Sequence, residues 1–349
     1  MSDVITLSLA QIESAAADAL RASNVSPGNA AAVARSIVAA ERDGQHIVGL
    51  SYLPTYCDHA ACGKVDGHAT PQLTELAASA IRVDACSGFA HPALSLGLPA
   101  LAAAARRQGI AVLVVGNSYA CGSLGYFVET LAEEGLVGLM VANASPSIAP
   151  FGGRRPFFGT NPLAFAAPRA ELPPLVVDQS SSVVAKVAVL DAQRRGVPVA
   201  EGWALDAVGQ PTTDADAAMA GSLCAIGGYK GVGLALLIDV LAGGLTASHF
   251  SFEASSFGDC DGGPPHTGQT VIALNPELLA GPQFASRVDT LLGAMKREPE
   301  VRLPGDRRLA ARETHRAGVP VPVTLWTLIQ RYAEQGSPMR PVPAAKACP

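Results

Sequence analysis

Residues 152–168, which read GGRRPFFGTNPLAFAAP, restrict the fold of this chain more than any other stretch. The two glycines permit positive φ, and the two arginines that follow place two cations in the same loop. Pro162 keeps Asn161 out of the right-handed helical region. Alternating apolar and small residues then predict a strand with one buried face. The stretch suits a turn that binds a phosphate-bearing ligand, and equally an ordinary strand–turn–strand with a charged tip.

Length and composition argue against several classes of protein. The chain has 349 residues, enough for more than one domain, and its net charge of −5 argues against nucleic acid as a partner. Its start lacks a basic region followed by an apolar core, and its apolar runs are too short and too rich in glycine to span a membrane. The seven cysteines form no CxxC pair, which predicts free thiols and a cytoplasmic location.

Hydrophobic periodicity predicts helices and strands along most of the chain. We expect helices at 7–22, 29–42, 92–108, 123–134, 183–195, 227–241, 283–295 and 323–335. We expect strands within 73–84 and at 110–115, 136–143, 163–167, 175–178 and 271–275. Residues 252–268 are rich in Gly, Asp, Ser and Pro and predict a loop, and 304–308 predict a basic turn.

The common nucleotide, metal and hydrolase motifs are absent from the sequence. It contains no GxGxxG, no GxxxxGK[ST], no HExxH and no GxSxG, so a Rossmann fold has no fingerprint here. The seven histidines are scattered singly. Because a zinc site needs three or four ligands, we expect no metal.

Four positions stand out as candidate functional residues, each with a purely structural alternative. Asp178 ends an apolar strand, where acids often face clefts, but it could instead cap a helix that starts near Ser182. Lys230 lies among four glycines and could reach a phosphate or ribose, or be a solvated surface lysine. His46 follows the end of a predicted helix, where it could act as a catalyst or cap the C-terminus of that helix. Arg307, paired with a second arginine, suits a phosphate clamp or a solubilising tip.

Eight segments, taken in order, resemble one known family. They are AERDG (40–44), KVDGHATP (64–71), FAHPAL (89–94), AEEGLV (132–137), FGTNPLAFAAP (158–168), GQPTTDADAAMAG (209–221), GGYKGVGLAL (227–236) and PGDRR (304–308). Together they resemble the type-2 malate/L-lactate dehydrogenase family over nearly the whole chain. Within it, HFSFE (249–253) and the PGDRR turn resemble the reductases that act on piperideine- and pyrroline-2-carboxylate.

That resemblance implies an α/β (α+β) fold that is not a Rossmann fold. It implies an NAD(P)-binding domain with a largely antiparallel sheet at 76–299. This domain would pack on a helical domain made from both chain ends, 1–75 with 300–340, followed by a disordered tail at 341–349. The resemblance also implies a homodimer with the active site near the subunit interface.

The same resemblance assigns a cofactor, NADPH or NADH, and the residues that hold it. They are Thr160, Asn161, Ser181, Ser182, Lys230 and Arg307. The expected partner is a small-molecule substrate.

The chain departs from the family where the chemistry should occur. The family's Gly-His-x-Ser-His-Gly is Gly-Gln-His-Ile-Val-Gly here, at 44–49, so its Ser-His pair is replaced by Ile47 and Val48. Tyr52 stands where the family has an arginine for the substrate carboxylate, and Tyr119 stands at a family histidine. The resemblance therefore assigns substrate binding to His46, Ile47, Val48 and Tyr52, and catalysis to Asp178 and Tyr119.

These replacements favour one reaction over others. Reduction of a ketone leaves an alkoxide that needs a nearby acid, whereas an iminium already carries its proton. We therefore expect an NAD(P)H-dependent oxidoreductase that reduces the C=N bond of a cyclic imine. A second hypothesis is a family member that has lost redox chemistry and acts as a binding protein, cyclase or isomerase. A third is a 2-keto-acid reductase.

Overall fold

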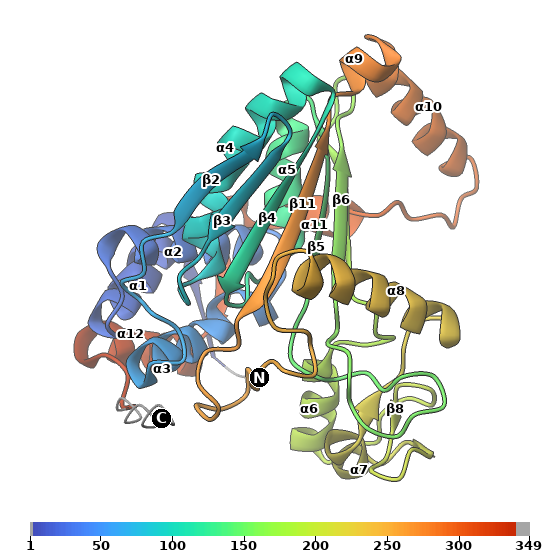
Figure 1. The fold of residues 1–349 in the computed structure, drawn as a ribbon. Coiled ribbons are helices and arrows are strands. Elements are labelled where there is room, and N and C mark those ends of the chain that lie inside the picture. Colours follow the sequence, from blue (N-terminus) through green and yellow to red (C-terminus); the bar gives the residue numbers. More distant parts are fainter. Residues whose placement is uncertain (1–2, 340–349) are drawn as a thin grey trace, which may run out of the picture.

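The computed structural model describes residues 3–339, arranged as a large mixed sheet, a helical unit and a small lobe (Figure 1). The tail predicted at 341–349 lies outside the described residues. The α-helices are α1 (Leu9–Ala22), α2 (Pro27–Arg42), α3 (Leu53–Cys62), α4 (Ala90–Gln108), α5 (Leu124–Glu133), α6 (Lys186–Arg195), α7 (Ala215–Ala220), α8 (Tyr229–Asp239), α9 (Pro276–Ala280), α10 (Phe284–Met295), α11 (Asp306–Thr314) and α12 (Val323–Gln335).

Strands and short helices complete the order of elements. The strands are β1 (Val4–Leu7), β2 (Gln72–Ala77), β3 (Ala80–Asp84), β4 (Ile110–Ser118), β5 (Val137–Ala142), β6 (Leu163–Ala167), β7 (Leu175–Gln179), β8 (Ala204–Leu205), β9 (Pro211–Thr212), β10 (Ser222–Leu223), β11 (Thr267–Leu274) and β12 (Val319–Pro322). Three 3₁₀ turns, η1 (His46–Val48), η2 (Leu50–Tyr52) and η4 (His315–Ala317), and one π-helix, η3 (Val240–Gly244), lie between them.

The large sheet has seven strands in the order β2-β3-β4-β11-β5-β6-β7. β3 and β4 are parallel, and the other neighbours are antiparallel. Helices α4 and α5 pack on one face, where the largest apolar core lies. On the opposite face Thr270 Oγ1 donates to Leu241 O (2.7 Å), which holds η3 against the centre of the sheet. The expected fold class, with a largely antiparallel sheet, is confirmed.

A helical unit forms from both ends of the chain (Figure 1). β1 pairs antiparallel with β12, and α1 packs against α2 and α12. Ser8 and Gln11 form a capping box that starts α1, and Pro27 at the first turn of α2 follows the cap Ser26. The expected helical unit from both chain ends is therefore present, while the domain boundaries themselves stay predictions.

A small lobe between β5 and α8 has its own core, which the periodicity did not predict. Strands β10, β8 and β9 form a three-stranded sheet beside α6 and α7. The buried residues of its core are Ile148, Phe158, Val189, Ala192, Val199, Ala204, Ala218, Leu223 and Ala235. Strands of two residues carry too few positions for an alternating pattern, so the small sheet left no periodic signal, although its helix α6 was predicted at 183–195.

Two sequence predictions need correction at the ends of elements. The basic turn predicted at 304–308 is instead the beginning of α11. Gly305, with φ of 88°, precedes the helix, and Asp306 Oδ2 accepts from Leu303 N (3.0 Å) at its first turn. Likewise, the strand predicted at 271–275 begins at Thr267, inside the predicted loop.

The length and polarity of the helices also decide whether any of them could cross a membrane. Within residues 3–339, no helix combines the length and the apolar character that crossing a bilayer requires.

Candidate active site

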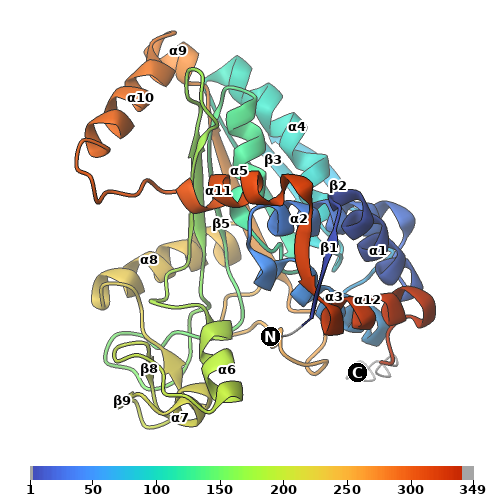
Figure 2. The same ribbon diagram turned by 180° about the vertical axis from the view of Figure 1, so that it is seen from behind.

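A cavity of about 370 Å³ lies where the end of α2, the start of α5, β7 and the start of α11 meet. Figure 2 shows α11 beside α2 and α5. The cavity is lined by Asp43, Gly44, Gln45, Ser123, Gly125, Tyr126, Val176, Asp178, Gly305, Arg307 and Arg308. The structure thus brings Asp178 and Arg307, far apart in the sequence, to one cavity, together with the loop that begins at Gly44.

Asp178 presents its carboxylate to this cavity from the end of β7. Its Oδ2 accepts hydrogen bonds from Ser123 Oγ (2.9 Å) and Gly125 N (2.8 Å). Desolvation raises the pKa of Asp178, although hydrogen bonds from Gly125 and Ser123 and the charge of Arg308 oppose that rise. The helix that Asp178 contacts is α5, so the alternative of a cap for a helix near Ser182 is wrong in its location.

Arg308 also lines the cavity, as the second arginine of the predicted phosphate clamp, although the family resemblance assigned only Arg307 to the cofactor. Its Nη1 lies 2.6 Å from Glu129 Oε2 and 3.5 Å from Asp43 Oδ2. Arg308 is only 9% exposed, and no residue of 3–339 accepts a hydrogen bond from its Nε or Nη2. Buried guanidinium N–H groups without acceptors are costly, so an anion in the cavity would stabilise them.

Polar groups of the turn at 158–162 form hydrogen bonds within the fold. Asn161 is fully buried and has φ of 37°. Its Nδ2 donates to Ala235 O (2.9 Å), and its Oδ1 accepts from Ser251 Oγ (3.1 Å). The side chain of Asn161 therefore ties the turn to α8, while Thr160 beside it stays half-exposed. Cofactor binding by both residues remains a prediction.

Ser181 lies directly beside this turn. Ser181 N donates to Thr160 O (2.8 Å), and Ser181 Oγ donates to Asn161 O (2.7 Å). Ser181 O also accepts a hydrogen bond from the segment that precedes α8. Ser181 and Ser182 are buried, whereas Lys230, at the start of α8, is exposed. Cofactor binding by these three residues remains a prediction.

Tyr119 lies in the core of the helical unit and not at the cavity. It is 0% exposed, and its hydroxyl forms a hydrogen bond with Nδ1 of the buried His59. Burial raises the pKa of Tyr119 well above its usual value and lowers that of His59 to about 4, with the Lys64 charge adding to the latter. Tyr52 is half-buried beside it, and burial raises its pKa to about 12. These phenols are protonated at every physiological pH.

The 44–49 loop begins at the cavity, which Gly44 and Gln45 line, and leads to Leu50 in the core of the helical unit. Ile47 is 54% exposed and Val48 is half-buried. His46 Nδ1 lies 2.5 Å from Oε2 of Glu41, a carboxylate that is almost completely buried. His46 was a candidate from the sequence but Glu41 was not, because nothing in the linear order shows that η1 turns back over the last turn of α2.

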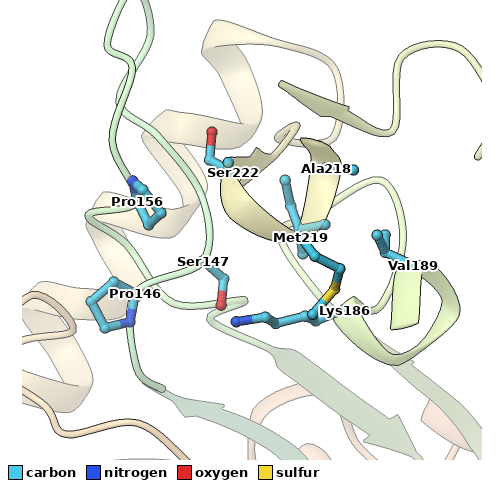
Figure 3. A pocket seen from close by; sticks show the side chains of 10 residues that line it. Pro146, Ser147, Pro156, Lys186, Val189, Ala218, Met219 and Ser222 are labelled. Atoms are coloured by element: carbon cyan, nitrogen blue, oxygen red, sulfur yellow. The ribbon is translucent and has the colours of Figure 1, made fainter. Parts of the chain in front are cut away.

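A second cavity, of only about 20 Å³, lies in the small lobe (Figure 3). It is lined by Pro146, Ser147, Pro156, Lys186, Val189, Ala218, Met219, Gly221, Ser222 and Leu223. Ser222 is buried there, and its Oγ has no partner among the residues that the structure describes. This volume suits a single water molecule and is too small for a substrate.

Metal-binding side chains do not gather anywhere in residues 3–339. No group of three or more His, Cys, Asp or Glu residues in that range is placed to hold a metal ion.

Comparison with known proteins agrees with this architecture. The family model described as malate/L-lactate dehydrogenase matches residues 7–330. The chain belongs to the malate/L-lactate dehydrogenase family. It is therefore an oxidoreductase of a family whose members use NAD(P), as the sequence predicted.

Relatives and solved structures cover nearly the whole chain. A (2R)-3-sulfolactate dehydrogenase (NADP(+)) from Chromohalobacter salexigens is 42% identical over 94% of this chain and 98% of its own length. A Δ1-pyrroline-2-carboxylate/Δ1-piperideine-2-carboxylate reductase from Pseudomonas putida is 42% identical over 89% and 92%. The crystal structure of Δ1-piperideine-2-carboxylate reductase from Pseudomonas syringae superimposes with a TM-score of 0.90, 36% identity, and coverage of 94% and 99%.

Proposed function

We propose that this protein reduces the C=N bond of a small cyclic imine that carries a carboxylate, with NADPH or NADH as the hydride source. The observation that carries the proposal is the 370 Å³ cavity with the Asp178 carboxylate on its wall. An iminium carbon becomes electrophilic when its nitrogen is cationic, and a nearby carboxylate stabilises that cation. The reductase names of several relatives support the same substrate class.

Two arginines at the cavity support the proposed binding of a dinucleotide. Arg307, together with the Arg308 N–H groups that have no acceptor within residues 3–339, would hold a phosphate. Thr160, Asn161, Ser181, Ser182 and Lys230 are proposed to hold the rest of the cofactor. When bound, the reduced nicotinamide supplies the hydride. Asp178 stays ionised beside the substrate and stabilises its positive charge, while the surrounding protein excludes water.

The proposed substrate site lies on the 44–52 side of the cavity. Ile47 and Val48 offer apolar surface to the ring, whereas Tyr52, which replaces the family's arginine, packs on the core of the helical unit. An open-chain keto acid has no cationic nitrogen for the Asp178 carboxylate to stabilise. For this reason we propose that open-chain keto acids such as pyruvate and oxaloacetate are poor substrates.

A keto-acid substrate is the second candidate, because one relative with 42% identity is a sulfolactate dehydrogenase. Its oxidised substrate would be a 2-keto acid with a second anionic group. Arg307 and Arg308 could hold such a group only at the expense of the phosphate site proposed above. The imine assignment is therefore favoured.

Two measurements test the proposal. Titration of the purified protein with NADH and with NADPH, followed by nicotinamide fluorescence, should show saturable binding of at least one. Consumption of that cofactor should then be faster with Δ1-piperideine-2-carboxylate or Δ1-pyrroline-2-carboxylate than with sulfopyruvate, pyruvate or oxaloacetate. Binding without turnover of any of these would favour a member of the family without redox chemistry. Faster turnover of sulfopyruvate would favour the keto-acid candidate.

We also propose that the protein is a homodimer. Four exposed leucine and valine residues on α8 and just after it support this: Leu236, Leu237, Val240 and Leu245, each between 50% and 55% exposed. A helix that is apolar on nearly all sides normally packs against protein on all sides. A second copy of the chain would cover this surface.

A cytoplasmic location is part of the proposal. The six described cysteines are free thiols, at positions 57, 62, 86, 121, 224 and 260. Such thiols persist most easily in a reducing compartment.

A further inference from the structure

His46 in the 44–49 loop forms an acid–base pair with Glu41 in the last turn of α2. Glu41 Oε2 lies 2.5 Å from His46 Nδ1, and Glu41 Oε1 accepts from Leu50 N (2.6 Å). Gly49 makes room for the carboxylate, since a Cβ there would lie 2.2 Å from Oε1. The carboxylate is fixed on both sides and thereby fixes the orientation of the imidazole ring.

The far edge of the His46 ring is available for chemistry. The His46 side chain is 47% exposed, and Nε2 has no hydrogen-bond partner among the described residues. The loop lies at the border of the large cavity, because Gly44 and Gln45 line that cavity directly. On its other side, a Cβ at Gly122, next to the Asp178 partner Ser123, would lie 3.9 Å from the carbonyl oxygen of Val48.

We propose that the Glu41–His46 pair is the acid of this site, with His46 Nε2 donating a proton to the nitrogen of the bound cyclic imine. This inference rests on the proposed function and identifies the source of the proton. The nitrogen lone pair takes the proton from Nε2–H and becomes an iminium, and the N–H electron pair stays on the imidazole. Hydride then adds to the carbon, and the C=N π pair becomes the lone pair of the neutral amine. Glu41 remains a carboxylate, and the exposed ring regains its proton from water.

The charged and titratable surroundings of His46 suit this role. The hydrogen bond to Glu41 raises the pKa of His46, partly opposed by burial. From the other side, His315 of η4 faces the ring, with 5.8 Å between ring centroids, and its Nδ1 lies 3.1 Å from the carbonyl oxygen of Arg42. The imidazolium therefore persists to a higher pH than in a free histidine, so the proton is available near neutrality.

The test combines two variants, a matched control and two readouts. His46→Asn removes the donor, Glu41→Gln removes the carboxylate charge, and His68→Asn removes an exposed imidazole on another loop. The first readout is the pH dependence of kcat/KM with Δ1-piperideine-2-carboxylate. The second is an NMR titration of the histidine side chains without cofactor, repeated with L-pipecolate to detect ligand contact.

We expect His46→Asn to lower kcat/KM by about 10²-fold near neutral pH, and to abolish the fall in rate as pH rises through the His46 pKa. In Glu41→Gln that fall should begin at a lower pH, and the NMR pKa of His46 should decrease. His68→Asn should match the wild type. Nicotinamide fluorescence should show unchanged cofactor binding in all three.

Different outcomes overturn different statements. A wild-type protein that binds cofactor but reduces no imine would contradict the proposed function. A wild-type protein that reduces the imine, with His46→Asn keeping its rate and pH profile, would overturn only the acid role. If Glu41→Gln fails to fold, the His46→Asn variant alone decides whether His46 is the acid, because the half-exposed His46 can still be replaced.

Discussion

At the scale of single residues, Asp178 serves the site at some cost to stability. Its raised pKa means that the carboxylate takes up a proton more readily in the folded protein than in the unfolded chain. Its stabilising contribution is therefore greatest below the unfolded-state pKa of about 3.9 and is lost as pH rises through the folded-state value. Functional carboxylates are often ionised at sites where the fold raises their pKa.

We expect Asp178→Asn to separate activity from stability. Turnover of a cyclic imine should fall about 10²-fold or more, because an amide cannot stabilise the iminium charge. The melting temperature should stay the same or rise, since the amide oxygen can still accept from Ser123 and Gly125. Kinetics and calorimetry check this, with the exposed Asp191→Asn as control. A lower melting temperature with full activity would make Asp178 only a helix cap.

Tyr119 provides a contrasting prediction. Tyr119→Phe should change kcat little, because its hydroxyl is buried and bonded to His59. The variant should lose about 1–3 kcal/mol of unfolding free energy, since the buried ring nitrogen of His59 loses its partner. Urea denaturation and steady-state kinetics measure the two effects. A large loss of kcat with little change in Asp178→Asn would instead make the tyrosine the acid.

The sequence could indicate some site residues and not others. Asp178 was found because it ends an apolar strand, and the arginine pair because it follows Pro-Gly. Ser123, which holds Asp178, could not be linked to it, because only the folded sheet brings the start of α5 to the end of β7. Glu41 was hidden for a similar reason, since a glutamate in a helix is usually a solvated surface residue.

At the scale of elements, two arginines of α11, Arg308 and Arg312, hold the helix in place. Arg312 donates to Asp43 Oδ1 (2.6 Å) and Glu129 Oε1 (2.9 Å), and so connects α11 to the end of α2 and to α5. Burial alone would raise the pKa values of Asp43 and Glu129, but hydrogen bonds to arginines outweigh it and lower both. The junction therefore stabilises the fold above their unfolded pKa values and weakens as pH falls through the folded ones.

Arg312→Ala should destabilise the protein by about 3–5 kcal/mol at neutral pH, because it leaves two largely buried carboxylates with less compensation. The remaining acid dependence of stability should be weaker than in the wild type. Chemical denaturation at pH 7 and in a series below pH 5 would show both effects. Arg316→Ala, which removes an exposed ion pair with Glu313, should leave stability unchanged. Equal losses in both variants would contradict this role of the junction.

Helices and strands were predictable where their hydrophobic pattern extends over many residues. The Ala-rich helices and the apolar strands β4, β5 and β11 have clear patterns, and the structure contains all of them. β1 and β12 escaped prediction, because each is four residues long and stabilised by pairing with the opposite end of the chain. The helix α11 was mistaken for a turn, since Pro-Gly-Asp is a strong local turn signal.

At the scale of the whole molecule, the apolar surface of α8 predicts association. Leu237→Asp should convert the proposed dimer into a monomer, because burying an apolar side chain contributes about 1.5–3 kcal/mol and a buried unpaired charge opposes it further. Light scattering after size-exclusion chromatography measures the mass. Leu76→Asp, at a similarly exposed leucine on β2, should not change it. A wild-type protein that is already monomeric would contradict the proposal.

The pairing of β1 with β12 also affects how the chain must be made. The first helices cannot complete their core until the last strand and α12 have left the ribosome, because those late elements cover them. At 5–20 residues per second, the N-terminal segment waits on the order of tens of seconds with apolar surface uncovered. Premature termination anywhere after the sheet would thus leave the beginning of the protein exposed. We expect such fragments to depend on chaperones even though the sheet itself is already synthesised.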